Sequence, residues 1–133
     1  MQEKRKILAV DDNSINLAVI EELLGSQYNL MTVSIGTEAL KMAQEFRPDL
    51  IILDIMLNGM NGYEVCQQIR KSSSLRHTKI IMVSAKAMES DRLKGYQSGA
   101  NDYLTKPFDG EELLAKVCAH LPPKPIKAIQ ENE

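Results

Sequence analysis

The chain has 133 residues, a formal net charge of −2, 44% hydrophobic residues and 26% charged residues. These values are typical of one globular domain, and the small net charge excludes a strong field that would recruit nucleic acid or an anionic membrane. No apolar run approaches the roughly 20 residues of a membrane span, and the charged first residues do not form a signal peptide. We therefore expect a cytoplasmic domain without direct nucleic-acid or membrane binding.

Apolar runs of strand length recur five times along the chain, at 7–10, 30–33, 50–53, 80–83 and 103–104. Segments with helical periodicity lie between them, so the pattern is a strand followed by a helix, repeated five times. Strands that alternate with helices predict an α/β fold, with a parallel sheet covered by helices on both faces. The runs at 50–53 and 80–83 are continuously apolar, as expected for strands buried on both faces.

The helical segments are indicated by apolar repeats and by capping residues. The repeats are Ile15, Val19 and Leu23, then Val65 and Ile69, and finally Leu113, Leu114, Val117, Cys118 and Leu121. Asn61 and Asp109 each stand three residues before a glutamate, which is the spacing of a helix N-cap. Cys66 and Cys118 both fall on apolar faces, far apart, without a CxxC motif and without a nearby histidine at metal-ligand spacing, so we interpret them as core thiols.

The composition changes at Pro122. From there the chain reads PPKPIKAIQENE, which is rich in proline, then polar, and carries no core periodicity. Such a segment is typical of a linker or tail. We therefore expect one folded domain over residues 1–121 and a linker or tail over 122–133.

Polar side chains follow the ends of the predicted strands. Asp11 and Asp12 follow the first strand, Asp54 the third, Ser84 the fourth and Lys106 the fifth. Ligands of doubly wound sheets bind outside the carboxyl ends of the strands, so we expect these residues along one edge. Taken singly, Asp11 and Asp12 could belong to a solvated helix N-cap, and Asp54 could be a loop acid. Their joint placement favours a shared site.

Three carboxylates in one place repel one another unless a cation is present. A hard divalent cation with oxygen ligands, Mg²⁺, suits them, and Mg²⁺ usually keeps waters and bridges to a phosphate. Lys106 can act as a point charge for one phosphoryl oxygen, and the Ser84 hydroxyl can donate to another. The residues themselves therefore predict a magnesium and phosphoryl site.

Five motifs stand in order at the expected places of the strand–helix series: ILAVDDN, PDLIILDIML, GMNGYEVCQQIR, KIIMVSA and GANDYLTKPF. Over residues 6–121 the chain resembles the CheY-like receiver domains of bacterial two-component response regulators. The resemblance implies a flavodoxin-like doubly wound (βα)5 fold with sheet order 2-1-3-4-5. It also implies a signalling domain rather than a separate enzyme. Asn58 and Asn61 stand where Pro and Asp are common in that family, and neither replaces a phosphorylation residue.

The resemblance assigns the chemistry to particular positions. It makes Asp54 the phosphoacceptor. It places Mg²⁺ on Asp11, Asp12, Asp54 and the backbone carbonyl of Met56.

The resemblance also identifies residues that respond to phosphorylation. Ser84 and Lys106 would contact the phosphoryl group, and Tyr103 would be the aromatic side chain whose position is coupled to it. The Lys106-Pro107 bond would be a cis peptide in this family. The sequence alone does not indicate this isomer, because only about 5–6% of X–Pro bonds are cis.

The implied phosphoryl donor is a phosphohistidine of a sensor histidine kinase or a histidine phosphotransfer protein. A homodimer and a fused output or kinase domain both stay open. Two other functions also stay open. A phosphorylation-independent docking domain usually lacks an acid or the lysine, and this chain keeps them all. A Mg²⁺-dependent aspartyl phosphatase of the haloacid dehalogenase type needs a second acid two residues after its nucleophile, where this chain has Met56.

Overall fold

The structure is a computed structural model that describes residues 4–57 and 60–122. Its strands are β1 (Lys6–Val10), β2 (Asn29–Val33), β3 (Leu50–Asp54), β4 (Met56–Leu57), β5 (Met60–Asn61), β6 (Lys79–Ser84) and β7 (Asp102–Thr105). Its helices are α1 (Ser14–Leu24), α2 (Ala39–Phe46), α3 (Gly62–Lys71), α4 (Glu89–Gln97) and α5 (Gly110–His120), with 3₁₀ turns at Gly36–Glu38 and Ser73–Leu75.

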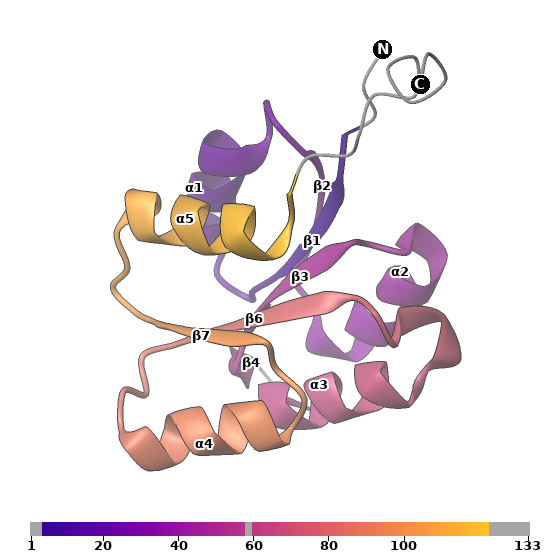
Figure 1. Ribbon diagram of the computed structural model, residues 1–133, viewed down its shortest axis with the longest axis vertical. Helices are drawn as coiled ribbons and strands as arrows, with labels where there is room; N and C mark the ends of the chain where they lie inside the picture. Colours follow the sequence, from indigo (N-terminus) through magenta and orange to yellow (C-terminus); the bar gives the residue numbers. More distant parts are fainter. Residues whose placement is uncertain (1–3, 58–59, 123–133) are drawn as a thin grey trace, which may run out of the picture.

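The main sheet is parallel and has five strands in the order β2-β1-β3-β6-β7 within the described ranges. This is the predicted order 2-1-3-4-5, counted without the short antiparallel pair of β4 and β5. Helices α1 and α5 cover one face of the sheet, and α2, α3 and α4 cover the other (Figure 1). The predicted doubly wound, flavodoxin-like α/β fold is confirmed.

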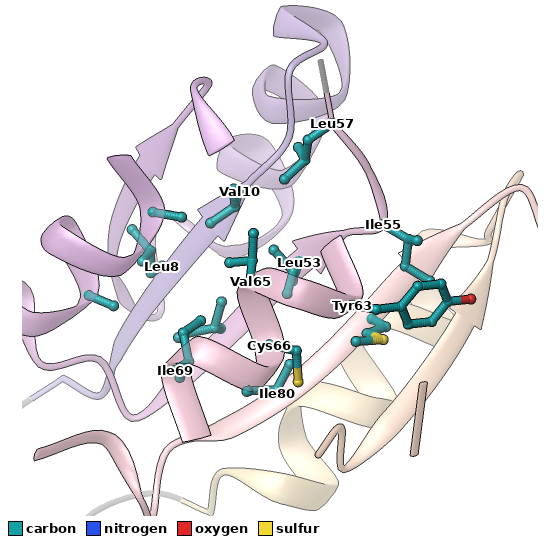
Figure 2. Close-up of a cluster of buried hydrophobic side chains, with 14 of the residues drawn as sticks. Leu8, Val10, Leu53, Ile55, Leu57, Tyr63, Val65, Cys66, Ile69 and Ile80 are labelled. Carbon is teal, nitrogen blue, oxygen red and sulfur yellow. The ribbon is translucent and has the colours of Figure 1, made fainter. Parts of the chain in front are cut away.

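A hydrophobic cluster fills each side of the sheet because the central strands alternate their side chains between two apolar layers. Leu8 and Val10 of β1 point to the α2–α3 side, where Val65 and Ile69 of α3 pack against them (Figure 2). Ile7 and Ala9 belong to the cluster on the α1–α5 side. All five residues of β3 are buried, as the continuous apolar run predicted, and the buried strand ends directly in Asp54.

The predicted apolar face of α1 is wrong, although the helix itself is present. The buried residues of α1 are Leu17, Ile20 and Leu24. Ile15 and Val19 are 73% and 44% exposed. A strict repeat of four residues drifts about 40° around an α-helix at each step, whereas alternating steps of three and four stay on one face. Leu17, Ile20 and Leu24 follow each other at steps of three and four residues, and these are the side chains that pack on the sheet.

The two cysteines differ in their surroundings. Cys66 is fully buried in the α3 cluster, and burial raises its pKa to about 11. Cys118 is exposed, so its prediction as a core thiol is wrong. The buried residues of α5 are Leu113 and Val117, which leaves Cys118 at the border of that stripe with its sulfur 3.7 Å from the Tyr28 hydroxyl.

Two predicted helix starts are confirmed by their caps. The Asn61 side chain accepts from the N–H of Tyr63, and Asp109 accepts from the N–H of Glu111. Apart from Pro122, the predicted tail over 122–133 lies outside the described residues, as does Asn58, so the domain boundary at 121 stays a prediction. Among the described helices none is long and apolar enough to cross a membrane.

Candidate functional site

Four polar residues stand at the carboxyl edge of the sheet, where the sequence predicted them. Asp11 follows β1, Asp54 and Ser84 are the last residues of β3 and β6, and Lys106 follows β7. Because β1, β3, β6 and β7 are consecutive neighbours in the parallel sheet, these positions lie along one edge. The fold therefore gathers residues that are widely separated in the sequence.

Lys106 links two buried acids. Its Nζ donates to Asp11 Oδ2 and to Asp54 Oδ2, at 3.2 Å in each case. Asp11 and Asp54 are 4% and 5% exposed, so these charges interact in a medium less polar than bulk water. Ser84 joins the group through its backbone, because the Lys106 N–H donates to the Ser84 carbonyl at 2.7 Å.

These charges shift one another's protonation equilibria. Burial raises the pKa of Asp54, and the negative charge of Asp11 raises it further, while Lys106 acts in the opposite direction. Burial lowers the pKa of Lys106, but Asp54 and Asp11 outweigh burial and bring that pKa above its ordinary value. Lys106 is therefore positively charged at neutral pH. The nearby positive charge of the protein does not fully balance the negative charge of ionised Asp54. Additional positive charge at this position would favour its ionised form.

A third carboxylate completes a set of oxygen donors that fits a hard cation. One carboxylate oxygen from each of Asp11, Asp12 and Asp54 lies within 4.8 Å of the others. Three carboxylates against one ammonium leave excess negative charge, and oxygen-only donors suit Mg²⁺ better than a soft metal. The acid cluster can therefore bind a metal ion of this kind.

Asp11 is held by the first turn of α1. Its Oδ1 accepts from the Asn13 N–H at 2.9 Å, and its Oδ2 accepts from the Asn16 side-chain amide at 3.2 Å. The N-cap of α1 is Asn13, whose side chain accepts from the N–H groups of Ile15 and Asn16. The two acids are therefore not needed to cap α1. Asn16 was not predicted as a site residue, and its position one turn after the cap was the only sequence signal for this role.

We expect Asp12→Ala to weaken Mg²⁺ binding more than Asp11→Ala. Asp11 already accepts hydrogen bonds from Asn13, Asn16 and Lys106, so it should act on the ion mainly through its charge. The resemblance to receivers implies that the second acid, Asp12, contacts the ion directly. Loss of the Asp11 carboxylate should weaken Mg²⁺ binding about tenfold, and loss of the Asp12 carboxylate should weaken it more. Magnesium titration followed by NMR would measure both. A greater loss in Asp11→Ala would show that this ligand order is wrong.

The Ser84 hydroxyl is connected to Tyr103 through one residue. Ser84 is fully buried, and its Oγ accepts from the Lys86 N–H at 3.0 Å. The carbonyl of the same Lys86 accepts from the Tyr103 hydroxyl at 2.8 Å. Tyr103 is 1% exposed, so its ring points inward. The link through Lys86 was not predicted, because a backbone contact leaves no residue-type signal in a sequence.

The segments that follow Asp54 and Lys106 bring two further predicted features to the same edge. The Met56 N–H donates to Asp54 Oδ1 at 3.2 Å, which places the residue named as a carbonyl ligand next to the acid. The Met56 side chain is 58% exposed. The Lys106-Pro107 peptide is cis, as the resemblance implied.

Acids and a lysine at the carboxyl edge of a doubly wound sheet place this chain among the α/β domains that bind ligands at that edge. The family model described as response regulator receiver domain matches residues 7–118. The chain belongs to the response regulator receiver domain family, and the resemblance seen in its motifs is confirmed.

Similar proteins come from several bacteria. The alkaline phosphatase synthesis transcriptional regulatory protein PhoP of Bacillus subtilis is 43% identical over 118 residues, which are 88% of this chain and 48% of PhoP. The Vibrio cholerae chemotaxis protein CheY4 is similar in structure, with a TM-score of 0.84, 33% identity, and coverage of 89% of this chain and 99% of CheY4.

One similar structure contains a metal ion. The receiver domain of the sensor histidine kinase PA1611 from Pseudomonas aeruginosa was solved with a magnesium ion coordinated in its active site cleft. It matches with a TM-score of 0.80 and 37% identity, over 87% of this chain and 96% of that domain. The curated relatives are longer proteins: this chain spans 25% of the Caulobacter vibrioides response regulator PleD and 48% of PhoP.

Proposed function

We propose that this chain is a phosphoacceptor receiver of a two-component phosphorelay, in which a partner's phosphohistidine transfers its phosphoryl group to Asp54. The observation that carries the proposal is the Lys106 ammonium, held 3.2 Å from the buried carboxylates of both Asp54 and Asp11. A cation fixed beside a nucleophilic carboxylate, with a hydroxyl on the neighbouring strand end, is suited to a tetrahedral dianion.

Each group has a role in the proposed transfer. A carboxylate oxygen of Asp54 forms the bond to phosphorus, while the bond from phosphorus to the partner's imidazole nitrogen breaks and its electron pair stays on that nitrogen. Lys106 pairs with one phosphoryl oxygen, and the Ser84 hydroxyl donates to another. Bound Mg²⁺, held by Asp11, Asp12, Asp54 and the Met56 carbonyl, would supply the positive charge that neutralises the crowded oxygens.

The exposed side of α1 supports a partner that approaches this edge. Helix α1 begins directly after the acidic pair, and it presents Ile15 and Val19 at 73% and 44% exposure. We propose that a sensor histidine kinase or a histidine phosphotransfer protein in the cytoplasm contacts this surface when it delivers the phosphoryl group. No separate enzymatic output and no direct nucleic-acid or membrane contact is proposed, whereas a homodimer or a fused output or kinase domain stays open.

The direct experiment is labelling with acetyl phosphate, followed by intact mass, in Mg²⁺ and in EDTA. A receiver should gain one phosphoryl group in Mg²⁺ and none in EDTA. A phosphorylation-independent docking domain should gain none in either buffer. An aspartyl phosphatase should release phosphate continuously without accumulating label. Either of the last two results would contradict the proposal.

Met56 should slow the loss of the phosphoryl group. Hydrolysis needs a water in line with the bond from Asp54 to phosphorus. The exposed side chains two residues after Asp54 and Ser84 are Met56 and Lys86. A thioether is a weak acceptor, so Met56 cannot orient a water well, and its length can obstruct the approach. Lys86 can favour the phosphorylated state by its charge.

We therefore expect a persistent phosphoryl group in the wild type and faster loss in Met56→Asn and Met56→Glu, by about tenfold or more, because a positioned polar group commonly contributes that much. Intact mass sampled over time after removal of donor would measure the rates. Met88→Glu, which changes an exposed methionine outside the acid cluster, is the matched control. If wild type loses its label fastest, Met56 does not obstruct the water.

A further inference from the structure

Helix α4 is attached to the domain by few side chains of its own. Of its nine residues, all of them described, only Gly95 is buried. Leu93 and Tyr96, its larger apolar residues, are 56% and 45% exposed. A helix that buries no large apolar side chain gains little from packing. The position of α4 therefore depends on side chains that reach it from other elements.

Two buried tyrosines supply this attachment. Tyr63 from α3 is 3% exposed, and its hydroxyl donates to the Asp91 carbonyl in the first turn of α4 at 3.2 Å. Tyr103 from β7 donates to the Lys86 carbonyl, just before α4, at 2.8 Å. In Figure 2 the Tyr63 ring lies at the end of the aliphatic cluster, next to Ile55, with its hydroxyl directed away from the other labelled side chains.

The rings of both tyrosines also contact cations of α4. Lys94 Nζ lies 4.8 Å from the centre of the Tyr63 ring, and the Arg92 guanidinium lies 5.4 Å from that of Tyr103. Gly95 allows the close packing, because a Cβ there would lie 3.0 Å from Tyr103 Cδ2. Tyr63 therefore holds α4 by its hydroxyl and by a cation–π contact, whereas Tyr103 holds α4 by a cation–π contact and the segment just before it by its hydroxyl.

A series of contacts joins the buried serine of the site to α4. Ser84 Oγ accepts from the Lys86 N–H, and the Lys86 carbonyl accepts from the Tyr103 hydroxyl. Tyr63 and Tyr103 belong to the same buried cluster under α4, and their hydroxyls donate to the backbone on either side of the start of that helix. Burial raises the pKa of Tyr63 to about 12, and the nearby Tyr103 adds to this effect. The Tyr63 hydroxyl in turn contacts Asp91 of α4.

We propose that Tyr63 is a positioning residue that transmits the response of Ser84 and Tyr103 to helix α4. This inference rests on the proposed function, because it needs a phosphoryl group that engages the Ser84 hydroxyl. When that hydroxyl reorients toward the phosphoryl group, its contact with the Lys86 N–H changes. Lys86 then shifts, and the hydrogen bond from the Tyr103 hydroxyl to the Lys86 carbonyl changes with it. Tyr63 then couples the shift of Tyr103 to the Asp91 carbonyl, and α4 moves because little else holds it.

The test compares Tyr63→Phe with wild type by backbone amide NMR of the 133-residue chain. Each protein is recorded with Mg²⁺ alone and with Mg²⁺ and beryllium trifluoride, which mimics a phosphoryl group on a carboxylate. Phenylalanine keeps the ring in the core and removes only the hydroxyl. The matched control is Tyr28→Phe, which removes a buried phenol from the cluster on the other face of the sheet.

In wild type and in Tyr28→Phe we expect the mimic to shift amides at 84–87 and throughout 89–97. In Tyr63→Phe the shifts at 84–87 should persist, while those at 89–97 should fall by about threefold or more, as expected when one hydrogen bond is lost from a balanced equilibrium. Equal α4 shifts in Tyr63→Phe and wild type would overturn the role of Tyr63 and would leave the proposed function unaffected. A wild type without shifts at 84–87 would overturn the proposed function and this inference together.

Discussion

Asp54→Asn is expected to abolish labelling by acetyl phosphate completely. Asparagine has the shape of aspartate, but its amide has no nucleophilic carboxylate oxygen. Asp54 and Asp11 are equally buried and both lie 3.2 Å from Lys106 Nζ, but both oxygens of Asp11 also accept from the first turn of α1, so Asp54 is the acid that we expect to react. Intact mass after incubation with Mg²⁺ and the donor should show one added phosphoryl group in wild type and none in the variant.

Asp49→Asn is the matched control for this experiment. Asp49 immediately precedes β3, whereas Asp54 ends it, so the two acids stand at opposite ends of the same strand. Asp49 accepts from the Lys6 N–H and lies 3.8 Å from the Arg5 guanidinium, away from the acid cluster. The control should label as wild type does. Equal labelling of Asp54→Asn and wild type would exclude Asp54 as the acceptor.

The fold could be predicted from the sequence because its main signals are local. Every predicted strand is present, with ends that differ by one residue or less, because continuous apolar runs and polar ends coincide with the sheet and its edge. The grouping of Asp11, Asp54 and Lys106 followed from one rule of geometry, that parallel strands bring their carboxyl ends together. The short pair β4–β5 was not predicted, because two-residue strands carry no periodicity.

The parts that the sequence did not predict depend on orientation and on backbone atoms. The exposed side of α1 was mistaken for its buried side, because Ile15 and Val19 form an apolar repeat as regular as that of Leu17 and Ile20. The connection from Ser84 through Lys86 uses a peptide group, which any residue type provides. Contacts of this kind appear only when the fold is known.

Arg70 illustrates the same limit, because its sequence context indicates only a cation in the last turn of α3. In the structure its Nε donates to the Gly99 carbonyl at 2.8 Å, its Nη1 to the Thr78 carbonyl at 2.6 Å, and its Nη2 to the Asn101 side chain at 2.7 Å. Asn101 Oδ1 also accepts from the Ile80 N–H, at the start of β6. One guanidinium thus joins α3, the turn before β6 and the loop before β7.

Gly99 is adapted to this arrangement. Its φ is +112°, and a Cβ at this position would lie 2.6 Å from Arg70 Cγ. A side chain there would strain the backbone and displace the arginine at the same time. The loop between α4 and β7 and the Arg70 side chain therefore form one structural unit. The contacts of Arg70 given above include no residue of the acid cluster.

Arg70→Ala is expected to lower the free energy of unfolding by about 2–4 kcal/mol, because several charge-assisted hydrogen bonds to backbone carbonyls are lost together. Arg70→Lys should recover only part of this, since one ammonium cannot reach three acceptors in the fork geometry of a guanidinium. Urea unfolding followed by circular dichroism would measure both. Arg76→Ala, which removes an exposed arginine nearby, should stay within about 0.5 kcal/mol of wild type. If Arg70→Ala and Arg76→Ala lose equal stability, the guanidinium does not hold these segments together.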